Sequence, residues 1–294
     1  MRIAIAGSSG LIGTALVESL RADGHEVLRL VRRPATAPTE VTWDPYKGEI
    51  DLAALAGVDA LINLAGAGVG DHRWTAKYKN TILQSRVKST ETIAKAAAEL
   101  KPTVLINGSA IGWYGDTGTS EVDESAPCAS GFLPDVVRQW EAATKPAVDA
   151  GVRVVLARTG LVMAPKGGAW AKMLPLFKLG LGGKLGSGKQ SWSFITLADE
   201  IAALKFLLTN EQISGPVNLT APNPATNAEI TKTLGKALRR PTLFPAPAFA
   251  LKLVLGEFSQ EVLGSNRVLP KKLLAAGFTF THPEIESATR TLLS

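Results

Sequence analysis

The stretch Arg2-Ile3-Ala4-Ile5-Ala6-Gly7-Ser8-Ser9-Gly10-Leu11-Ile12-Gly13 decides the fold. Its apolar half predicts a buried strand, and its glycines predict a tight turn into a helix. The first glycine permits the turn, the second lets the backbone approach a diphosphate, and the third lets the helix pack closely on the strand. Because helix N-termini attract anions, we expect a dinucleotide diphosphate here, bound by Gly7, Ser9, Gly10, Leu11, Ile12 and Gly13. The alternative is a glycine-rich strand-to-helix turn that binds nothing.

Beyond this turn, apolar runs alternate with longer helical patterns along the first half of the chain. This alternation is typical of the α/β class, and it predicts a Rossmann-like, doubly wound parallel sheet covered by helices. We expect strands over residues 2–6, 26–31, 59–63, 103–107 and 153–158. We expect helices over residues 11–22, 75–100 and 132–150, where Pro146 can kink the last one.

After residue 160 the pattern changes, because glycines gather between Gly180 and Gly188 and prolines gather after residue 240. We therefore predict two lobes. Residues 1–160 form the nucleotide-binding Rossmann domain, and residues 161–294 form a smaller C-terminal α/β lobe that caps the substrate. Chains of this kind often return to the sheet for one more strand, and residues 216–219 are the candidate for it.

Composition excludes several classes of protein. Of the 294 residues, 46% are hydrophobic and 20% are charged, which argues against disorder. No apolar run reaches the roughly 18 residues of a membrane helix, and one cysteine with three scattered histidines predicts no metal site. The net charge of +6 comes from scattered Lys and Arg, so we expect neither nucleic acid nor membrane as a partner. The first strand follows no leader sequence, which favours the cytoplasm. We expect a monomer or a homodimer.

Two arginines follow the predicted second strand, in the sequence Val31-Arg32-Arg33-Pro34. In dinucleotide-binding folds an acid about 20 residues beyond the glycines holds the ribose 2′-hydroxyl of NAD, whereas an arginine accepts the 2′-phosphate of NADP. No Asp or Glu stands there, so we predict NADP(H), with Arg32 and Arg33 as ligands of the 2′-phosphate. The alternative is a pair of solvated arginines. Both interpretations are correct if one arginine contacts the phosphate and the other is solvated.

The third predicted strand ends in Asn63-Leu64-Ala65-Gly66, small residues that let the adenosine half of a nucleotide lie against the backbone. A tight turn needs the same residues. In the helix that follows, Arg86 lies on the apolar face that begins at Ile82. An unpaired buried charge is costly, so we expect either a protein carboxylate or a cofactor phosphate to meet Arg86.

Together these segments resemble extended short-chain dehydrogenases/reductases, and within them the epimerase family proteins with a C-terminal DUF1731 segment. The resemblance covers nearly the whole chain and rests on Gly7–Gly13, Asn63–Gly66, Arg73–Thr75, Ser85-Arg86, Ser109–Gly115, Trp140–Ala143, Arg158–Gly160 and Gly186–Gln190. Asn266–Pro270 and Leu273–Phe278 resemble the DUF1731 part, which would begin near residue 240. The resemblance implies NADP(H) binding by the glycine turn, Arg32, Arg33, Leu64, Ala65, Arg86 and the turn after the fifth strand, through Val162.

Relatives with known chemistry use a serine or threonine, a tyrosine, and a lysine four residues after that tyrosine. None of the three tyrosines here has such a lysine. Alignment on Glu141 puts Leu133 and Val137 at the two positions. Ser109 matches the serine and Tyr114 lies five residues further on, so these two are the catalytic candidates, with packing as the alternative role of Tyr114.

Four lysines lie in or near the glycine-rich part of the second lobe: Lys172, Lys178, Lys184 and Lys189. They suit an anionic substrate such as a nucleotide sugar, and surface lysines around a flexible loop explain them equally well. The sequence thus predicts an NADP(H)-binding oxidoreductase or epimerase-like enzyme without the tyrosine–lysine pair, acting on a nucleotide sugar or a carbonyl compound. The alternative is an NADP(H)-binding regulatory or scaffold protein without turnover, since the resemblance extends to a plant branch linked to plastid division.

Overall fold

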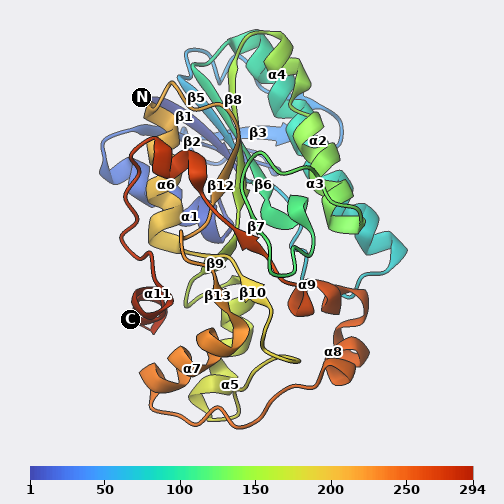
Figure 1. Ribbon diagram of the computed structural model, residues 1–294. Helices are drawn as coiled ribbons and strands as arrows, with labels where there is room; N and C mark the ends of the chain where they lie inside the picture. Colours follow the sequence, from blue (N-terminus) through green and yellow to red (C-terminus); the bar gives the residue numbers. More distant parts are fainter. Residues whose placement is uncertain (294) are drawn as a thin grey trace.

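An eight-stranded sheet forms the centre of the protein in the computed structural model, which describes residues 1–293 (Figure 1). Its strand order is β12-β8-β6-β5-β1-β2-β3-β4. All neighbours pair in parallel except β3 and β4. The strands are β1 Arg2–Ala6, β2 Glu26–Val31, β3 Glu40–Asp44, β4 Glu49–Ile50, β5 Ala60–Asn63, β6 Val104–Ala110, β8 Arg153–Thr159 and β12 Gly215–Leu219. The predicted Rossmann-like parallel sheet is confirmed.

The direction of winding reverses beside β1. The chain builds outward through β2 and β3, and β5 then pairs with the other edge of β1. In open parallel sheets ligands bind outside the carboxyl ends of the strands at such a reversal. Gly7 follows β1 there and Leu64 follows β5, so the glycine turn stands at the point where the topology favours a ligand.

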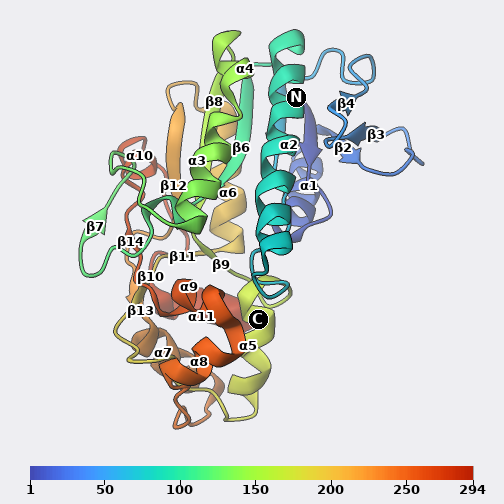
Figure 2. The same cartoon turned by 90° about the vertical axis from the view of Figure 1, so that its right-hand side faces the viewer.

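Helices cover both faces of the sheet because the strand side chains alternate between two cores. Ile3 and Ile5 pack in a cluster with helices α1 and α6, whereas Ala4 and Ala6 pack in a cluster with α2 and α4. Figure 2 shows α2, α3 and α4 together over one face. The helices are α1 Leu11–Ala22, α2 Ala76–Leu100, α3 Phe132–Ala142, α4 Lys145–Asp149 and α6 Leu197–Thr209. Ile111–Tyr114 forms the short helix η1, and Glu121–Val122 forms β7.

The smaller lobe has its own core, which includes Trp170, Phe194, Leu234 and Ile285. The remaining elements after residue 160 are β9 Leu161–Met163, α5 Gly168–Lys178, β10 Ser191–Trp192, β11 Phe194–Thr196, β13 Ala225–Thr226, α7 Asn227–Leu238, α8 Ala248–Leu255, η2 Gly256–Phe258, α9 Ser259–Leu263, β14 Arg267–Val268, α10 Lys271–Ala275 and α11 Ile285–Leu293. Two of them contact the first lobe, because β14 pairs with β7 and α10 packs on β12. Helix α6 packs on α1 and β12 pairs with β8, so part of the segment after residue 160 returns to the large sheet. We propose a lobe division at residue 160 with this return.

One local prediction differs from the structure, and one hairpin was not predicted. The helix expected over residues 132–150 is two helices, because the chain breaks at Ala143 and Thr144, and Pro146 lies in the first turn of α4 instead of kinking one long helix. Proline fits a first turn, where its missing N–H has no partner to lose. The β3–β4 hairpin is an addition that the sequence analysis did not include.

None of the helices within residues 1–293 is both long and apolar enough to cross a bilayer. In the same residues, no group of three or more His, Cys, Asp or Glu side chains is arranged to hold a metal ion.

One carboxyl group lies fully inside the large core. Glu200, in the first turn of α6, is 0% exposed, and its Oε1 accepts a hydrogen bond of 2.8 Å from Thr159 Oγ1. Its Oε2 has no hydrogen-bond partner among residues 1–293. Burial raises the pKa of Glu200 to about 8, because the charged form loses its water.

Glu200 should therefore make stability depend on pH. The folded state holds its proton up to about pH 8, whereas the unfolded chain releases it near the usual 4.5, so the free energy of unfolding falls as pH rises between these values. The variant Glu200→Gln keeps an acceptor for Thr159 and removes the proton. Urea unfolding at several pH values should show a flatter dependence for the variant. Parallel curves for the two proteins would contradict the assignment.

Candidate functional site

The glycine turn is packed too tightly for side chains. Gly7 has a φ of +74°, and a Cβ atom on it would lie 2.5 Å from the Leu64 carbonyl carbon. A Cβ on Gly13 would lie 2.2 Å from the Gly7 carbonyl oxygen. Helix α1 begins at this turn with no side-chain cap on Gly10 and no acidic residue in its first turn. The first amides of α1 therefore suit an external anion.

A cavity of about 790 Å³ opens on this turn at the carboxyl edge of the sheet. Eight of the predicted cofactor residues line it, namely Gly7, Ser9, Gly10, Arg32, Arg33, Leu64, Ala65 and Gly66. The structure thus brings together residues from β1, β2, β5 and the loops that follow them. The same cavity therefore borders both the glycine turn and the two arginines.

The two arginines differ in their surroundings. Arg33 donates two hydrogen bonds to Glu40 on β3, at 2.8 and 2.6 Å, and this contact lowers the pKa of Glu40 to about 2. Arg32 lines the cavity and makes no hydrogen bond or ion pair with any other described residue. Arg32 is therefore the guanidinium that is free to meet a phosphate, and Arg33 is held by protein.

Sequence reasoning missed several lining residues. Trp43, Pro45 and Tyr46 of the β3–β4 hairpin form a wall of the cavity beside Arg29, whose Nε donates to Ser8 Oγ at 3.3 Å. Two signals were present in the sequence: the alternation of Val41 and Trp43, which is typical of a strand, and a charge at Arg29 within an apolar strand.

Arg86 lies behind the cavity. Its Nη1 donates to the carbonyl oxygens of Ala67, at 2.8 Å, and Ile82, at 3.1 Å, and its guanidinium lies 5.0 Å from the centre of the Trp140 ring. Burial lowers the pKa of Arg86 to about 10. Of the two alternatives for Arg86, a carboxylate partner is absent among the described residues, and backbone oxygens accept its hydrogen bonds. Binding of a cofactor phosphate by Arg86 stays a prediction.

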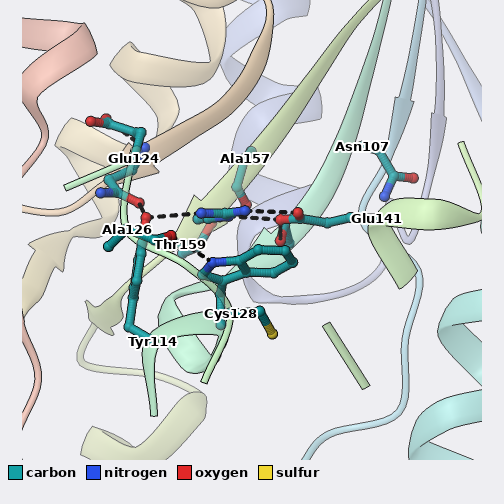
Figure 3. A network of polar contacts seen from close by, with 12 residues as sticks. Asn107, Tyr114, Glu124, Ala126, Cys128, Glu141, Ala157 and Thr159 are labelled. Carbon is teal, nitrogen blue, oxygen red and sulfur yellow. Dashed lines mark hydrogen bonds and ion pairs between the residues drawn. The ribbon is translucent and has the colours of Figure 1, made fainter. Parts of the chain in front are cut away.

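Ser109 belongs to a buried ion-pair network, of which Figure 3 labels Glu141 and Tyr114. Its Oγ donates to Glu141 Oε1 at 2.6 Å, and Arg158 donates to both oxygens of the same carboxylate, at 2.8 and 2.9 Å. Glu141 is 8% exposed and Arg158 is 2% exposed. The serine that matches the relatives is thus held by Glu141, and its oxygen keeps lone pairs that can accept a hydrogen bond.

Tyr114 lies at the other end of the network. Its hydroxyl accepts a hydrogen bond from Arg158 Nη1 at 3.0 Å and donates one to Asn218 Oδ1 at 2.7 Å. Burial raises the pKa of Tyr114 above its ordinary value, while the charge of Arg158 opposes this shift. The hydroxyl proton of Tyr114 is already committed to Asn218, so its geometry is that of a buried structural contact between η1 and β12.

The remaining predicted residues lie around the cavity rather than in it. Leu11 packs beside Gly167, and Ile12 and Val162 pack against the core cluster of α1 and α6. Leu133 and Val137 lie close to the position where a Gly112 side chain would stand, at 3.5 and 3.7 Å. Hydrocarbon therefore occupies the helix positions where relatives carry tyrosine and lysine.

A second cavity, of about 800 Å³, separates the two lobes. The large lobe contributes Trp74, the loop of Gly115 and Asp116, and residues 130–134, while the small lobe contributes Gly186 to Gln190 and residues between Ala248 and Asn266. None of the four lysines suggested as an anion cradle lines it, and Lys172 instead donates to the Gly70 carbonyl at 2.7 Å.

The charged groups of this second cavity are mostly acidic. Asp116, Glu257 and Glu261 line it with Lys252 as the one basic residue. Glu257 is paired with Lys79 at 2.5 Å. Asp116 accepts backbone hydrogen bonds from Gly118 and Ser265, at 2.9 and 3.1 Å. Burial, and then the charge of Asp116, raise the pKa of Glu261. The cavity therefore offers little positive charge.

Comparison with known families gives two matches. Residues 3–219 match the NAD dependent epimerase/dehydratase family, and residues 246–292 match a domain of unknown function, DUF1731. An epimerase family protein of Mycobacterium bovis is 47% identical over 287 residues, which are 97% of this chain and 95% of that protein.

Solved structures agree with these matches. The crystal structure of human epimerase family protein SDR39U1 (isoform 2) with NADPH has a TM-score of 0.91 at 35% identity and covers 99% of both chains. A structure from Corynebacterium glutamicum, described as a nucleoside-diphosphate sugar epimerase, has a TM-score of 0.82 at 36% identity. The match covers 100% of this chain and 58% of the Corynebacterium chain.

Breaking the buried ion pair should cost much stability, and removing both of its partners should restore most of it. Arg158→Met leaves the Glu141 carboxylate buried without its partner, which should lower the free energy of unfolding by about 3–5 kcal/mol. Adding Glu141→Met should recover most of that loss. Arg138→Met, which removes the exposed ion pair with Asp135, is the matched control and should cost about 1 kcal/mol or less. Urea unfolding measures all four proteins, and equal losses for the two single variants would count against a buried pair.

Proposed function

The chain belongs to the NAD dependent epimerase/dehydratase family, and from this premise we propose that it is an NADP(H)-dependent oxidoreductase acting on a small carbonyl or hydroxyl compound. The observation that carries the proposal is the 790 Å³ cavity, which joins the uncapped start of α1 to the unpaired guanidinium of Arg32. A dinucleotide with a 2′-phosphate needs both features.

The residues of the first cavity fit NADP(H) part by part. The amides at the start of α1 suit the diphosphate, and Leu64, Ala65 and Gly66 leave room for the adenosine against the backbone. Tyr46, which is 55% exposed, offers an aromatic face to the same cavity as Arg32, which suits an adenine beside a 2′-phosphate. The similar human protein was crystallised with NADPH, which supports the same choice of cofactor.

Bound NADP(H) supplies a hydride, and the chain's own residues must hold the substrate and handle a proton. We propose that Ser109 orients the substrate oxygen through its free lone pairs, while Glu141 fixes the direction of its hydroxyl. Tyr114 remains the second catalytic candidate, although its proton already belongs to a hydrogen bond with Asn218. With Leu133 and Val137 at the relatives' positions, the proton that the reduced carbonyl oxygen takes up would come from water.

The second cavity is proposed as the substrate site. A nucleoside diphosphate sugar would bring its phosphates against Asp116 and Glu261, and Lys252 is the one basic residue among those that line the cavity. Lys79 lies at the same wall, but it is paired with Glu257. Trp74 and Phe132 offer aromatic surface on the same wall. Of the two substrate classes that the sequence suggested, these contacts favour a carbonyl compound without phosphate. The expectation of a cytoplasmic monomer or homodimer stays a prediction.

Arg32 should carry the preference for the phosphorylated cofactor. Arg32→Ala removes a charge-assisted hydrogen bond, so calorimetry should show NADPH binding weakened by about 10- to 100-fold while NADH changes by less than about threefold. Arg33→Ala is the matched control and should weaken NADPH less, because Glu40 already holds that guanidinium. Equal weakening of both cofactors by Arg32→Ala would defeat the assignment.

The substrate assignment can be tested with NADPH-loaded protein. Uncharged aromatic carbonyl compounds, such as phenanthrenequinone, should oxidise NADPH in an assay at 340 nm, whereas UDP-glucose should give neither turnover nor a thermal shift. The variant Asp116→Asn with Glu261→Gln should change the rate with the uncharged compounds by less than about threefold, because the two carboxylates repel only a charged group such as a phosphate. Saturable binding of UDP-glucose would overturn the substrate class. Tight NADPH binding without turnover of any compound would favour the regulatory alternative.

A further inference from the structure

The smaller lobe exposes an unusual amount of apolar surface at one end. Of the twelve large hydrophobic side chains that are exposed, eight lie in residues 176–189 and 232–254. Leu179, Leu243, Phe249 and Leu253 are each more than 70% exposed. We call these two segments the distal face. A cluster of exposed apolar side chains at one end of a protein is typical of an interaction surface.

The two segments lie side by side. Ala246 N donates to the Lys184 carbonyl at 2.9 Å, and Gly186 N donates to the Ala246 carbonyl at 2.8 Å. A Cβ atom on Gly183 would lie 2.1 Å from the Phe244 carbonyl oxygen, so these two backbones touch. Figure 1 and Figure 2 show α5, α7 and α8 at the end of the molecule that faces away from the large sheet.

The same face carries the protein's excess of positive charge. Residues 176–189 and 232–254 contain eight Lys and Arg residues and no Asp or Glu, whereas the whole chain has a net charge of +6. All eight side chains are exposed. The lysines of the glycine-rich loop that line neither large cavity belong to this set, so the face gives them a common role.

Helix α8 presents apolar side chains that nothing in residues 1–293 covers. None of its residues is buried, and Phe249 and Leu253, four residues apart, share one side of the helix. Beside it a small cavity of about 330 Å³ combines Lys184 and Lys232 with Thr231, Thr242 and the apolar Leu243 and Pro245. Ammonium, hydroxyl and apolar groups around one small cavity suit a phosphate group that is attached to a hydrocarbon chain.

We propose that the distal face docks on a membrane surface that contains anionic lipids. Lysines and arginines meet the headgroups, while Phe249, Leu253 and the exposed leucines insert among the first acyl carbons. A second copy of the chain on this face would bring eight cations against eight cations. The two segments lie together at the outer end of the smaller lobe, where a flat membrane surface can meet both of them (Figure 2). The proposal departs from the expectation that the chain has no membrane partner.

Docking would also place the substrate cavity beside the bilayer. Ala248 and Lys252 of α8 line that cavity, and Phe249 and Leu253 of the same helix belong to the distal face. An apolar carbonyl compound dissolved in the membrane would then have a short path to the cavity. The docking itself does not depend on which compound the cavity takes.

Vesicle sedimentation of the full-length protein tests the docking. Vesicles of phosphatidylcholine with about 30% phosphatidylglycerol should bind the protein at least about tenfold more tightly than pure phosphatidylcholine, and about 0.5 M salt should weaken the binding. The charge variant Lys178→Glu with Arg240→Glu and the apolar variant Phe249→Ser with Leu253→Ser should each lower affinity by about tenfold or more.

Matched controls separate this face from general charge and apolarity. Lys77→Glu with Lys95→Glu changes two exposed lysines of α2, and Val148→Ser changes an exposed apolar residue of α4; both should leave binding within about twofold. All variants alter exposed side chains, and thermal unfolding checks that each one folds. Absence of binding to anionic vesicles, or equal loss in the controls, overturns the proposal. A dimer in light scattering that Phe249→Ser with Leu253→Ser dissociates would assign the face to a second copy instead.

Discussion

The contact between the Gly7 carbonyl and the backbone of Gly13 leaves no room for a side chain, and the site depends on it. It draws the start of α1 onto the carboxyl end of β1, where the neighbouring strand β5 also ends. The uncapped amides of α1, the small residues after β5 and the arginines after β2 therefore open on one cavity. A side chain at either glycine would push these elements apart before any ligand arrived.

The chemical half of the site is built differently from the binding half. Ser109, Glu141, Arg158 and Tyr114 satisfy one another in the protein interior, and they join β6, α3, β8 and η1 into one rigid unit. Removing one charged partner from such a unit would lower the stability of the fold strongly. The apolar side chains of Leu133 and Val137 carry no such cost, because they need no partner. The arrangement can hold a cofactor and orient a substrate oxygen. It does not build the acid–base pair with which relatives move a proton.

The sequence predicted the parallel sheet and the turn from β1 into α1 well, because local rules determine them. Glycine spacing, strand periodicity and the absence of an acid after β2 are visible without knowing which segments meet. The pairing of Arg33 with Glu40, and the carbonyl partners of Arg86, could not be predicted, because they depend on where β3 and the β5 loop come to lie. The same holds for the second cavity, whose acidic lining joins residues more than a hundred positions apart, such as Asp116 and Glu261. The sequence grouped four lysines near Gly180–Gly188, but Lys172 donates to the Gly70 carbonyl, and only the fold places the other three at the outer end of the smaller lobe.

A crystal structure of the protein with NADPH tests the central claim most directly. The account predicts density for the diphosphate over the first turn of α1, with the 2′-phosphate beside Arg32 and the nicotinamide directed toward the cavity between the lobes. A diphosphate bound away from the Gly7–Gly13 turn, or a 2′-phosphate that leaves Arg32 in solvent, would contradict it.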